Sequence, residues 1–287
     1  LHLWTRRQRQ MCIRDSTSAY QRVCRLMGFA SLGSGSSGNA TIVAVSRSIF
    51  LVDCGFKVRT MERRLSQLDI SPGDIDAIFI THEHSDHISG LAGFAHKYNI
   101  KTFASYGTQK KAFIGANCSI FDADRAFEID GVKITPVRTP HDAREPTQFI
   151  FEDDIEKVGV LTDIGKPTSH VLQEFESCTH LLLEANHDER MLANGSYPQQ
   201  LKRRISGDFG HLSNAQALHV LERIYTSDMQ VRLGHISEQN NSVEVLTETF
   251  RKVARQVASL EFANQKQGFN WVGRRPMARQ ISFDRVV

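Results

Sequence analysis

The 287 residues of the sequence are 40% hydrophobic, enough for one large α/β domain or two small ones, and no apolar run approaches the roughly 20 residues that a membrane span needs. The net charge of +3 arises at the ends, because residues 1–26 hold six Arg and one Asp, and residues 273–287 hold four Arg and one Asp. Residues 27–272 hold 25 basic and 30 acidic side chains, a net charge of −5, so composition excludes a strongly basic nucleic-acid-binding domain.

The first 26 residues lack the apolar stretch of a secretory signal. Residues 11–16 look like translated sequencing-adaptor DNA, and we expect residues 1–26 to be a non-native or disordered leader. A basic arm for nucleic acid and a targeting peptide are the alternatives. We expect residues 273–287 to be a disordered or non-native tail. The five cysteines are odd in number and include no Cys-x-x-Cys pair, which favours a reduced, cytoplasmic compartment.

The domain begins with a strand-rich segment. The predicted strands are Phe29–Leu32, Thr41–Ala44 and Ile49–Val52. The loop at residues 33–39 is rich in Gly and Ser but lacks the Gly-Lys-Ser/Thr ending of a P-loop. It is either a tight connection or a rim loop that contacts a phosphate, with Ser36 and Asn39 as the candidate contacts.

A dense group of metal-ligand side chains follows the predicted strand Ala77–Ile80. His82 and His84 are two residues apart, so in extended backbone both imidazoles face one side. Asp86 and His87 lie where the chain turns into a helix predicted over residues 88–97, and can point at a second position nearby. Imidazole and carboxylate suit Zn, Mn or Fe, and metal pairs in hydrolases lie about 3.5–4 Å apart. The alternative, a solvated polar turn, has no packing reason to follow a buried strand.

Two later strands also end in candidate ligands. The strand Val132–Arg138 leads into a Thr-Pro-His corner, which holds His141 at the sheet edge. The pair Phe149–Glu152 and Lys157–Thr162 resembles a hairpin and ends in Asp163. One carboxylate can bridge two cations, and a helix N-cap is the alternative role for Asp163. The other elements expected here are a helix at 61–68, a strand at 102–105 and weakly patterned chain at 106–130.

The last third repeats the pattern of strand followed by polar residues. The strand Leu181–Leu183 leads into Glu184, and the strand Val231–Leu233 leads into His235. Helices are predicted over residues 200–205, 214–224 and 243–258. The first of these contains a basic run that is either a solvated face or a set of phosphate contacts: Lys202, Arg203 and Arg204.

The string His82-x-His84-x-Asp86-His87 after a strand resembles the signature of the metallo-β-lactamase-fold hydrolases. Four further segments resemble the bacterial WalJ/YycJ (VicX) group of exonucleases: residues 33–39, 51–55, 184–188 and 210–214. The resemblance runs from about Met27 to about Trp271. It implies an α/β fold, a four-layer αβ/βα sandwich, with the metal site at the edge between two mixed sheets. The hydrolase domain is therefore expected at residues 27–272.

The resemblance also implies how the ligands are divided. Two divalent metal ions, Zn or Mn, are expected. The metal-one group is His82, His84 and His141, and the metal-two group is Asp86, His87 and His235, with Asp163 bridging them. Asp53 matches a residue that orients the metal loop by hydrogen bonds without binding metal. Asp86, a carboxylate in place of a softer thiolate, suits a phosphodiesterase more than a lactam-cleaving site.

Glu184 and His211 form a second candidate pair. In tRNA 3′-end nucleases of the family, Glu-Ala-Thr and His-Ser-Thr segments relay a proton to the leaving oxygen. This chain has similar segments, with Asn186 in place of Thr. The pair is either a general-acid device, a role that contributes about 10²–10⁴-fold, or a structural hydrogen bond. His187 is either a rim residue or a phosphate contact.

Three functions follow as hypotheses. The leading one is a metal-dependent phosphodiesterase that acts on DNA or RNA ends, resembling a 5′→3′ DNA exonuclease and serving DNA repair. The alternative is a small-molecule hydrolase that opens a thioester, lactone or cyclic phosphodiester, which the acidity of residues 27–272 favours. A non-catalytic metal-binding protein is disfavoured because every expected ligand is present. The sequence does not predict an oligomeric state.

Overall fold

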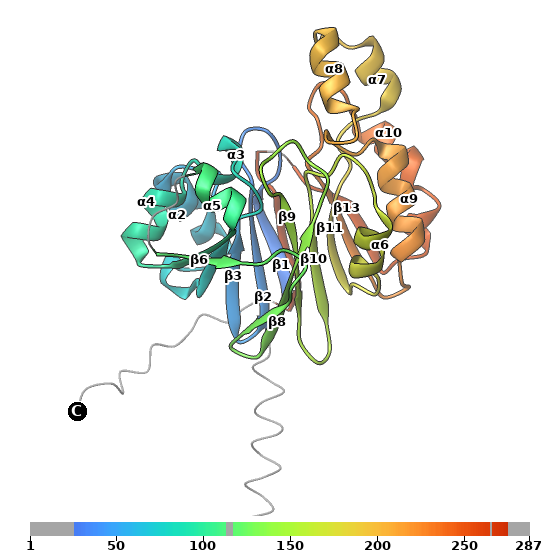
Figure 1. Ribbon diagram of the computed structural model, residues 1–287. Coiled ribbons are helices and arrows are strands. Elements are labelled where there is room, and N and C mark those ends of the chain that lie inside the picture. The colour runs from blue at the N-terminus through green and yellow to red at the C-terminus, as the bar shows by residue number, and fades with distance from the viewer. Residues whose placement is uncertain (1–25, 113–116, 265, 275–287) are drawn as a thin grey trace, which may run out of the picture.

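The computed structural model describes residues 26–112, 117–264 and 266–274. Two seven-stranded sheets pack face to face, and helices cover the outer face of each sheet (Figure 1). This is the four-layer sandwich that the sequence predicts. The expectations for residues 1–25 and 275–287 lie outside the described residues. Among the described residues, no helix combines the length and apolar character needed to cross a bilayer.

The first sheet has the strand order β14-β1-β2-β3-β4-β5-β6. Its strands are β1 (Leu26–Gly33), β2 (Ala40–Ser46), β3 (Ser48–Val52), β4 (Ala77–Phe79), β5 (Lys101–Ser105), β6 (Cys118–Phe121) and β14 (Phe269–Arg274). Strands β3 to β6 run parallel, and β1 pairs antiparallel with both β2 and β14. The helices of this half are α2 (Val58–Gln67), α3 (Ser85–Ile88), α4 (Leu91–Tyr98) and α5 (Tyr106–Ala112), with a 3₁₀ turn at Pro72–Asp74.

The second sheet has the order β13-β12-β11-β10-β9-β8-β7. Its strands are β7 (Phe127–Ile129), β8 (Val132–Arg138), β9 (Thr147–Glu152), β10 (Lys157–Leu161), β11 (His180–Glu184), β12 (Gln230–Gly234) and β13 (Ser259–Phe262). Strands β10 to β13 run parallel. The helices of this half are α6 (Ser169–Phe175), α7 (Glu189–Asn194), α8 (Gln199–Ile205), α9 (Asn214–Ile224) and α10 (Val243–Phe250), with a 3₁₀ turn at Val253–Arg255.

Phenylalanines fill the space between the sheets. The rings of Phe50 and Phe151 are 5.4 Å apart, and so are those of Phe79 and Phe149. All four side chains are fully buried, and burying one contributes about 1.5–3 kcal/mol. Separate apolar clusters lie between each sheet and its helices. The two sheets are therefore held in fixed register, which fixes the edge where their strands end.

The parallel strands end at one edge of the sandwich, where such sheets place ligand sites. Two glycines bring the chain together there. A Cβ on Gly55 would collide with the carbonyl of Asp86, and one on Gly90 with the carbonyl of Phe56. Helix α3 therefore packs directly on the loop that follows β3, carrying the end of the histidine-rich segment with it.

Several predicted boundaries are wrong. The helix expected at 88–97 is two helices, α3 and α4, separated at Ser89–Gly90. The helix expected at 243–258 ends at Phe250, although Val253 and Val257 stay buried in the irregular turn that follows. The spacing of these apolar residues indicated correctly that they are buried, but not that they are helical. The weakly patterned residues 106–130 contain α5, β6 and β7, each too short to show a clear period.

Helices α7 and α8 form a hairpin, residues 188–209, that stands above the edge of the sandwich (Figure 1). The two segments that lead into and out of this α7–α8 hairpin lie side by side. The amide of Asn186 donates to the carbonyl of Leu212 at 3.0 Å, and the amide of Asn214 donates to the carbonyl of His187 at 2.8 Å. The hairpin is thus tied at its base and projects over the strand ends.

Candidate metal centre

The structure brings all seven predicted ligands together at this edge. Single ligand atoms of His82, His84 and His141 lie within 4.8 Å of one another, and the same holds for Asp86, His87 and His235. A third such set joins Asp163 to His82 and His87. These sets match the metal-one group, the metal-two group and a bridging carboxylate. Asp163 faces both groups because its carboxylate converges with His82 of the metal-one group and His87 of the metal-two group. Its Oδ2 lies 3.5 Å from Nε2 of His87, and its Oδ1 lies 3.3 Å from Nε2 of His235.

The alternation predicted for the first two histidines is present. Nε2 of His82 and Nδ1 of His84 lie 2.9 Å apart, so two different ring nitrogens converge on one point. Their rings are nearly perpendicular, with an interplanar angle of 81°. His84 is the N-cap of α3, which then directs Asp86 and His87 toward the second group.

The donor atoms fit a bound cation. Several buried side-chain atoms of the described residues have no hydrogen-bond partner, and three of them lie at this edge: Nε2 of His141, Nε2 of His235 and Oδ2 of Asp163. Leaving such atoms unpaired costs about 1–3 kcal/mol each, more if charged. All three belong to the predicted ligand set. Divalent cations at the two groups would satisfy them, and N/O donors of this kind suit Zn or Mn.

Three of the candidate ligand histidines, His87, His141 and His235, are held from behind through Nδ1. Nδ1 of His87 lies 2.7 Å from Oδ2 of Asp53, and Nδ1 of His141 lies 3.0 Å from the carbonyl of Gly210. Nδ1 of His235 lies 3.0 Å from Oε1 of Glu184. Carboxylate and carbonyl oxygens only accept, so Nδ1 of each of these three rings carries a proton and Nε2 is the nitrogen left to bind a metal.

Asp53 holds the metal loop as the sequence analysis expects. Its carboxylate accepts from the amide and the hydroxyl of Thr81 as well as from His87. The backbone φ angles of Asp53, Asp163 and His235 are 63°, 51° and 52°, in the left-handed region that few non-Gly residues adopt. Such angles persist where the surrounding structure enforces them, and they concentrate at functional sites.

Burial and neighbouring charges shift the pKa values of the histidines in the site. Burial lowers the pKa of His87, but the charges of Asp53 and Asp163 outweigh it and raise that pKa well above its ordinary value. Burial also lowers the pKa of His235, but Asp163 and Glu184 outweigh burial and raise this pKa to about 9. Burial and the neighbouring histidines lower the pKa of His82. The carboxylates thus attract positive charge to the metal-two group, and a metal that binds there must displace protons.

Glu184 and His211 form the predicted pair. Oε1 of Glu184 lies 2.8 Å from Nδ1 of His211, and Oε2 accepts from the amides of Ile164 and Leu212. Glu184 is fully buried, so it touches His211 and not the solvent. His211 lies 3.8 Å from Asp163 through Nδ1. This arrangement makes His211 the exposed partner and Glu184 its positioning residue.

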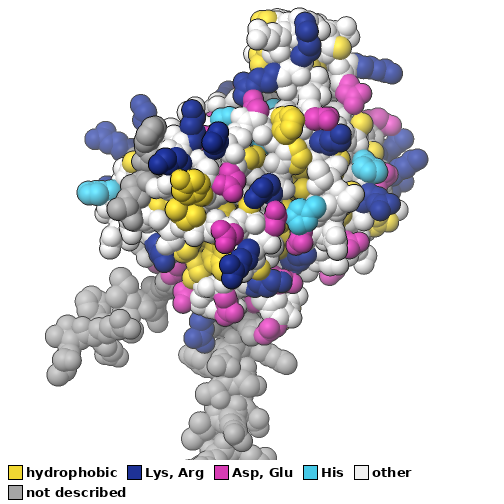
Figure 2. All heavy atoms as spheres, viewed as in Figure 1, with side chains coloured by type: hydrophobic (Ala, Val, Ile, Leu, Met, Phe, Trp, Pro, Cys, Tyr) yellow, Lys and Arg dark blue, Asp and Glu magenta, His cyan; other side chains and the backbone are white. Residues whose placement is uncertain are grey.

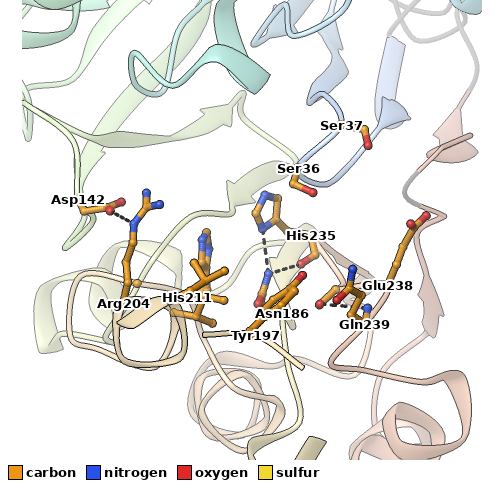
Figure 3. Close-up of a pocket in the computed structure, with 14 residues that line it drawn as sticks. Ser36, Ser37, Asp142, Asn186, Tyr197, Arg204, His211, His235, Glu238 and Gln239 are labelled. Atoms are coloured by element: carbon orange, nitrogen blue, oxygen red, sulfur yellow. Dashed lines mark hydrogen bonds and ion pairs between the residues drawn. The ribbon is translucent and has the colours of Figure 1, made fainter. Parts of the chain in front are cut away.

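A cavity of about 300 Å³, the metal-site cavity, opens beside these groups (Figure 3). Its walls include His211, His235 and Ser36. Arg204 of α8 also lines it, and its Nε lies 2.5 Å from Oδ2 of Asp142, an ion pair at one end of the cavity (Figure 3). The cavity is therefore bounded by one candidate metal ligand, the candidate acid and a guanidinium.

The other predicted substrate contacts are placed differently. Lys202 Nζ donates to the carbonyl of Ala193, and Arg203 is exposed but does not line the cavity. Asn39 is buried and donates to Oδ2 of Asp86 at 3.1 Å, so it supports the metal-two group and does not face the rim. His187 is buried too, 1% exposed, at the base of the α7–α8 hairpin.

Most of the residues that line the cavity were not predicted as site residues, and Asp142 and Tyr197 are two of them. Asp142 places Oδ1 3.4 Å from Nε2 of His141, and Tyr197 reaches the cavity from the connection between α7 and α8. The position of Asp142 directly after His141 is a local signal that could have found it. Tyr197 carries no such signal, because only the fold of the hairpin brings it to the cavity.

The comparisons with known proteins agree with this geometry. A family model described as a beta-lactamase superfamily domain matches residues 49–236. Exodeoxyribonuclease WalJ of Streptococcus pneumoniae serotype 2 is 34% identical over 226 residues, 76% of this chain and 84% of that protein. Exodeoxyribonuclease YycJ of Bacillus anthracis is 31% identical over 224 residues, 76% of this chain and 85% of that protein.

The solved structures include proteins of the same fold. The metallo-beta-lactamase fold protein YhfI from Bacillus subtilis superposes with a TM-score of 0.64 at 14% identity, over 85% of this chain and 97% of that one. At this identity the likeness concerns the fold alone. The chain therefore belongs to the metallo-β-lactamase superfamily and is a hydrolase whose relatives include the WalJ and YycJ exodeoxyribonucleases.

Proposed function

We propose that residues 27–272 form one hydrolase domain that uses two divalent metals, Zn or Mn, to cleave phosphodiester bonds at nucleic-acid ends. The observation that carries the proposal is the pair of ligand groups joined by Asp163, with His211 beside them in the wall of the same cavity. The closest chemical fit is a 5′→3′ exodeoxyribonuclease, as the names of the WalJ and YycJ relatives suggest. A cytoplasmic role in DNA repair is consistent with this assignment.

The chain's own residues have distinct tasks in this proposal. Two bound cations would lower the pKa of water toward neutrality and neutralise charge on a phosphoryl group. His211, with Nδ1 held by Glu184, donates its Nε2 proton to the leaving oxygen. Arg204 exchanges its contact with Asp142 for a substrate phosphate, since a guanidinium binds both anions in the same way.

A nucleic-acid substrate needs cations near the cavity despite the acidic domain. Figure 2 shows Lys and Arg side chains gathered on the projecting α7–α8 hairpin. The hairpin carries four cations against three acidic side chains, a net charge of +1: Arg190, Lys202, Arg203 and Arg204 against Asp188, Glu189 and Asp208. This local excess lies next to the metal-site cavity, where it favours a polyanion over a neutral thioester or lactone.

The test is cleavage by metal-loaded protein of four substrates: 5′-labelled single-stranded DNA, double-stranded DNA, RNA and a chromogenic phosphodiester. We expect stepwise release of nucleotides from DNA ends, loss of activity on chelation and recovery with Zn or Mn. Cleavage of the small substrate with none of the nucleic acids would refute the proposed substrate class and favour a small-molecule hydrolase. No cleavage of any substrate would refute the phosphodiesterase itself.

A further inference from the structure

A second cavity, of about 360 Å³, adjoins the metal-site cavity. We call it the Val243 cavity, and it lies between the start of α10 and the end of β13. Ser237 and Glu238 line both cavities, so the two are direct neighbours. Figure 3 shows Glu238 at the end of the metal-site cavity opposite Asp142 and Arg204.

The lining of the Val243 cavity is apolar inside and polar at its rim. Val243, Leu246 and Phe262 form apolar wall. Glu238 and Lys266 form an ion pair at the rim, with 3.5 Å between Nζ and Oε1. Val243 is 61% exposed although it is hydrophobic, and it lines a cavity that neighbours the metal-site cavity. An apolar wall with a few polar groups is typical of a small-molecule or nucleobase site.

We propose that the Val243 cavity holds the nucleobase of the nucleotide next to the cleaved phosphodiester, on the metal-two side. Ser237 is two residues from His235, and two residues of chain span at most about 7 Å, so an adjacent nucleotide can reach the cavity while its phosphate lies at the metals. The inference rests on the proposed function and extends it to a binding subsite.

The chemistry of the cavity implies stacking without base selection. Aromatic and apolar side chains contact the faces of any base, and such contacts tolerate all sequences. The side chain of Asn241 in the back wall already bonds to Asn214 and to the carbonyl of Ala185, so it is engaged within the protein. Affinity should therefore depend on the presence of a base and little on its identity.

The test measures binding of labelled single-stranded DNA in the presence of a chelator, which prevents cleavage, and then cleavage with metal restored. Val243→Asn removes an exposed apolar contact without adding charge. We expect its Kd for DNA to rise roughly fivefold, near the lower end of what one stacked base contributes. A scan with a single abasic nucleotide should find one position near the cleaved end whose penalty is large in the wild type and small in Val243→Asn.

Ile155→Asn is the matched control. Ile155 is 66% exposed and lies in the β9–β10 turn, at the opposite end of β10 from Asp163. We expect it to bind DNA like the wild type. Equal abasic penalties in the wild type and in Val243→Asn would overturn the base subsite and leave the proposed function intact. A wild type that cleaves only the chromogenic phosphodiester would overturn both.

Discussion

Oε1 of Glu184 lies 2.8 Å from Nδ1 of His211 and at the same time 3.0 Å from Nδ1 of His235. One carboxylate oxygen therefore orients both the candidate acid and a ligand of the metal-two group. The other oxygen is occupied by two backbone amides, so the carboxylate has no freedom to turn. Any change at Glu184 should disturb metal binding and proton transfer together, whereas a change at His211 separates them.

His211→Ala should keep both metals but slow turnover on DNA by about 10²–10⁴-fold, because it removes a proton donor and no ligand. Both kcat and kcat/KM should fall together, as expected for a lost transition-state interaction. Steady-state kinetics and elemental analysis of the same preparation provide the measurement.

The control for His211→Ala is a nitrophenyl phosphodiester. Its leaving oxygen needs no proton, so the defect should shrink on that substrate. If the variant lost a metal, or slowed both substrates equally, His211 would be a ligand or a structural residue.

Asp163→Ala should lose more than one metal's worth of binding, since Asp163 faces both ligand groups. We expect about two metals per chain in the reconstituted wild type and fewer than one in the variant, by elemental analysis. Asp130→Ala is the control, because Asp130 has nearly the same backbone φ, 50° against 51°, in an exposed turn. A wild type that binds one metal at saturation would contradict the two-metal centre.

Arg204→Ala should raise KM for DNA about tenfold, because it removes the guanidinium that lines the metal-site cavity. The slope of log KM against log salt should flatten by about one unit. Arg203→Ala, one position along the same helix but outside the cavity lining, should change KM by less than about twofold in the same titration. Equal effects from the two variants would mean that the hairpin acts only through its net charge.

His180 should make the fold less stable in acid. It is 4% exposed, and burial, followed by the charge of Arg232, lowers its pKa to about 4. The unfolded chain binds this proton at about pH 6.5, so the stabilisation is complete above that pH and is lost as pH falls toward 4. The loss between pH 7 and pH 5 is on the order of 2 kcal/mol.

Denaturant unfolding at pH 7 and pH 5 measures this effect. His180→Gln should lose less stability between the two pH values than the wild type does. The surface variant His96→Gln should behave like the wild type. Both variants keep the metal site, so its own pH dependence cancels in the comparison. An unchanged difference in His180→Gln would contradict the assignment.

The meeting of the candidate ligands at one edge was predictable because most of the segments that carry them follow a strand. His82, Asp163 and His235 lie directly after or close to the ends of β4, β10 and β12, and parallel strands end at one edge. The role of Asn39 was not predictable in this way. It contacts Asp86 and His87 from far along the chain, and only the packing that Gly55 allows brings them together.

His187 shows the opposite limit. Its sequence neighbours Glu184 and Asn186 face the site, but the bridge to Ser213 turns His187 into the base of the hairpin. The range of α9, residues 214–224, was predicted correctly, and the Ser213–Gln216 capping box at its start is a purely local interaction. Interactions between residues close in the sequence were thus predictable, whereas burial by residues far along the chain was not.

Because its base is held by hydrogen bonds, the α7–α8 hairpin can change in sequence independently of the metal centre. The backbone hydrogen bonds between Asn186 and Leu212 and between His187 and Asn214 hold the two ends of the segment together. Insertions, deletions or charge changes within residues 188–209 can then accumulate without shifting β11 or Glu184 at its end. Proteins that evolve from this chain could therefore bind a different polymer while keeping the same hydrolytic chemistry.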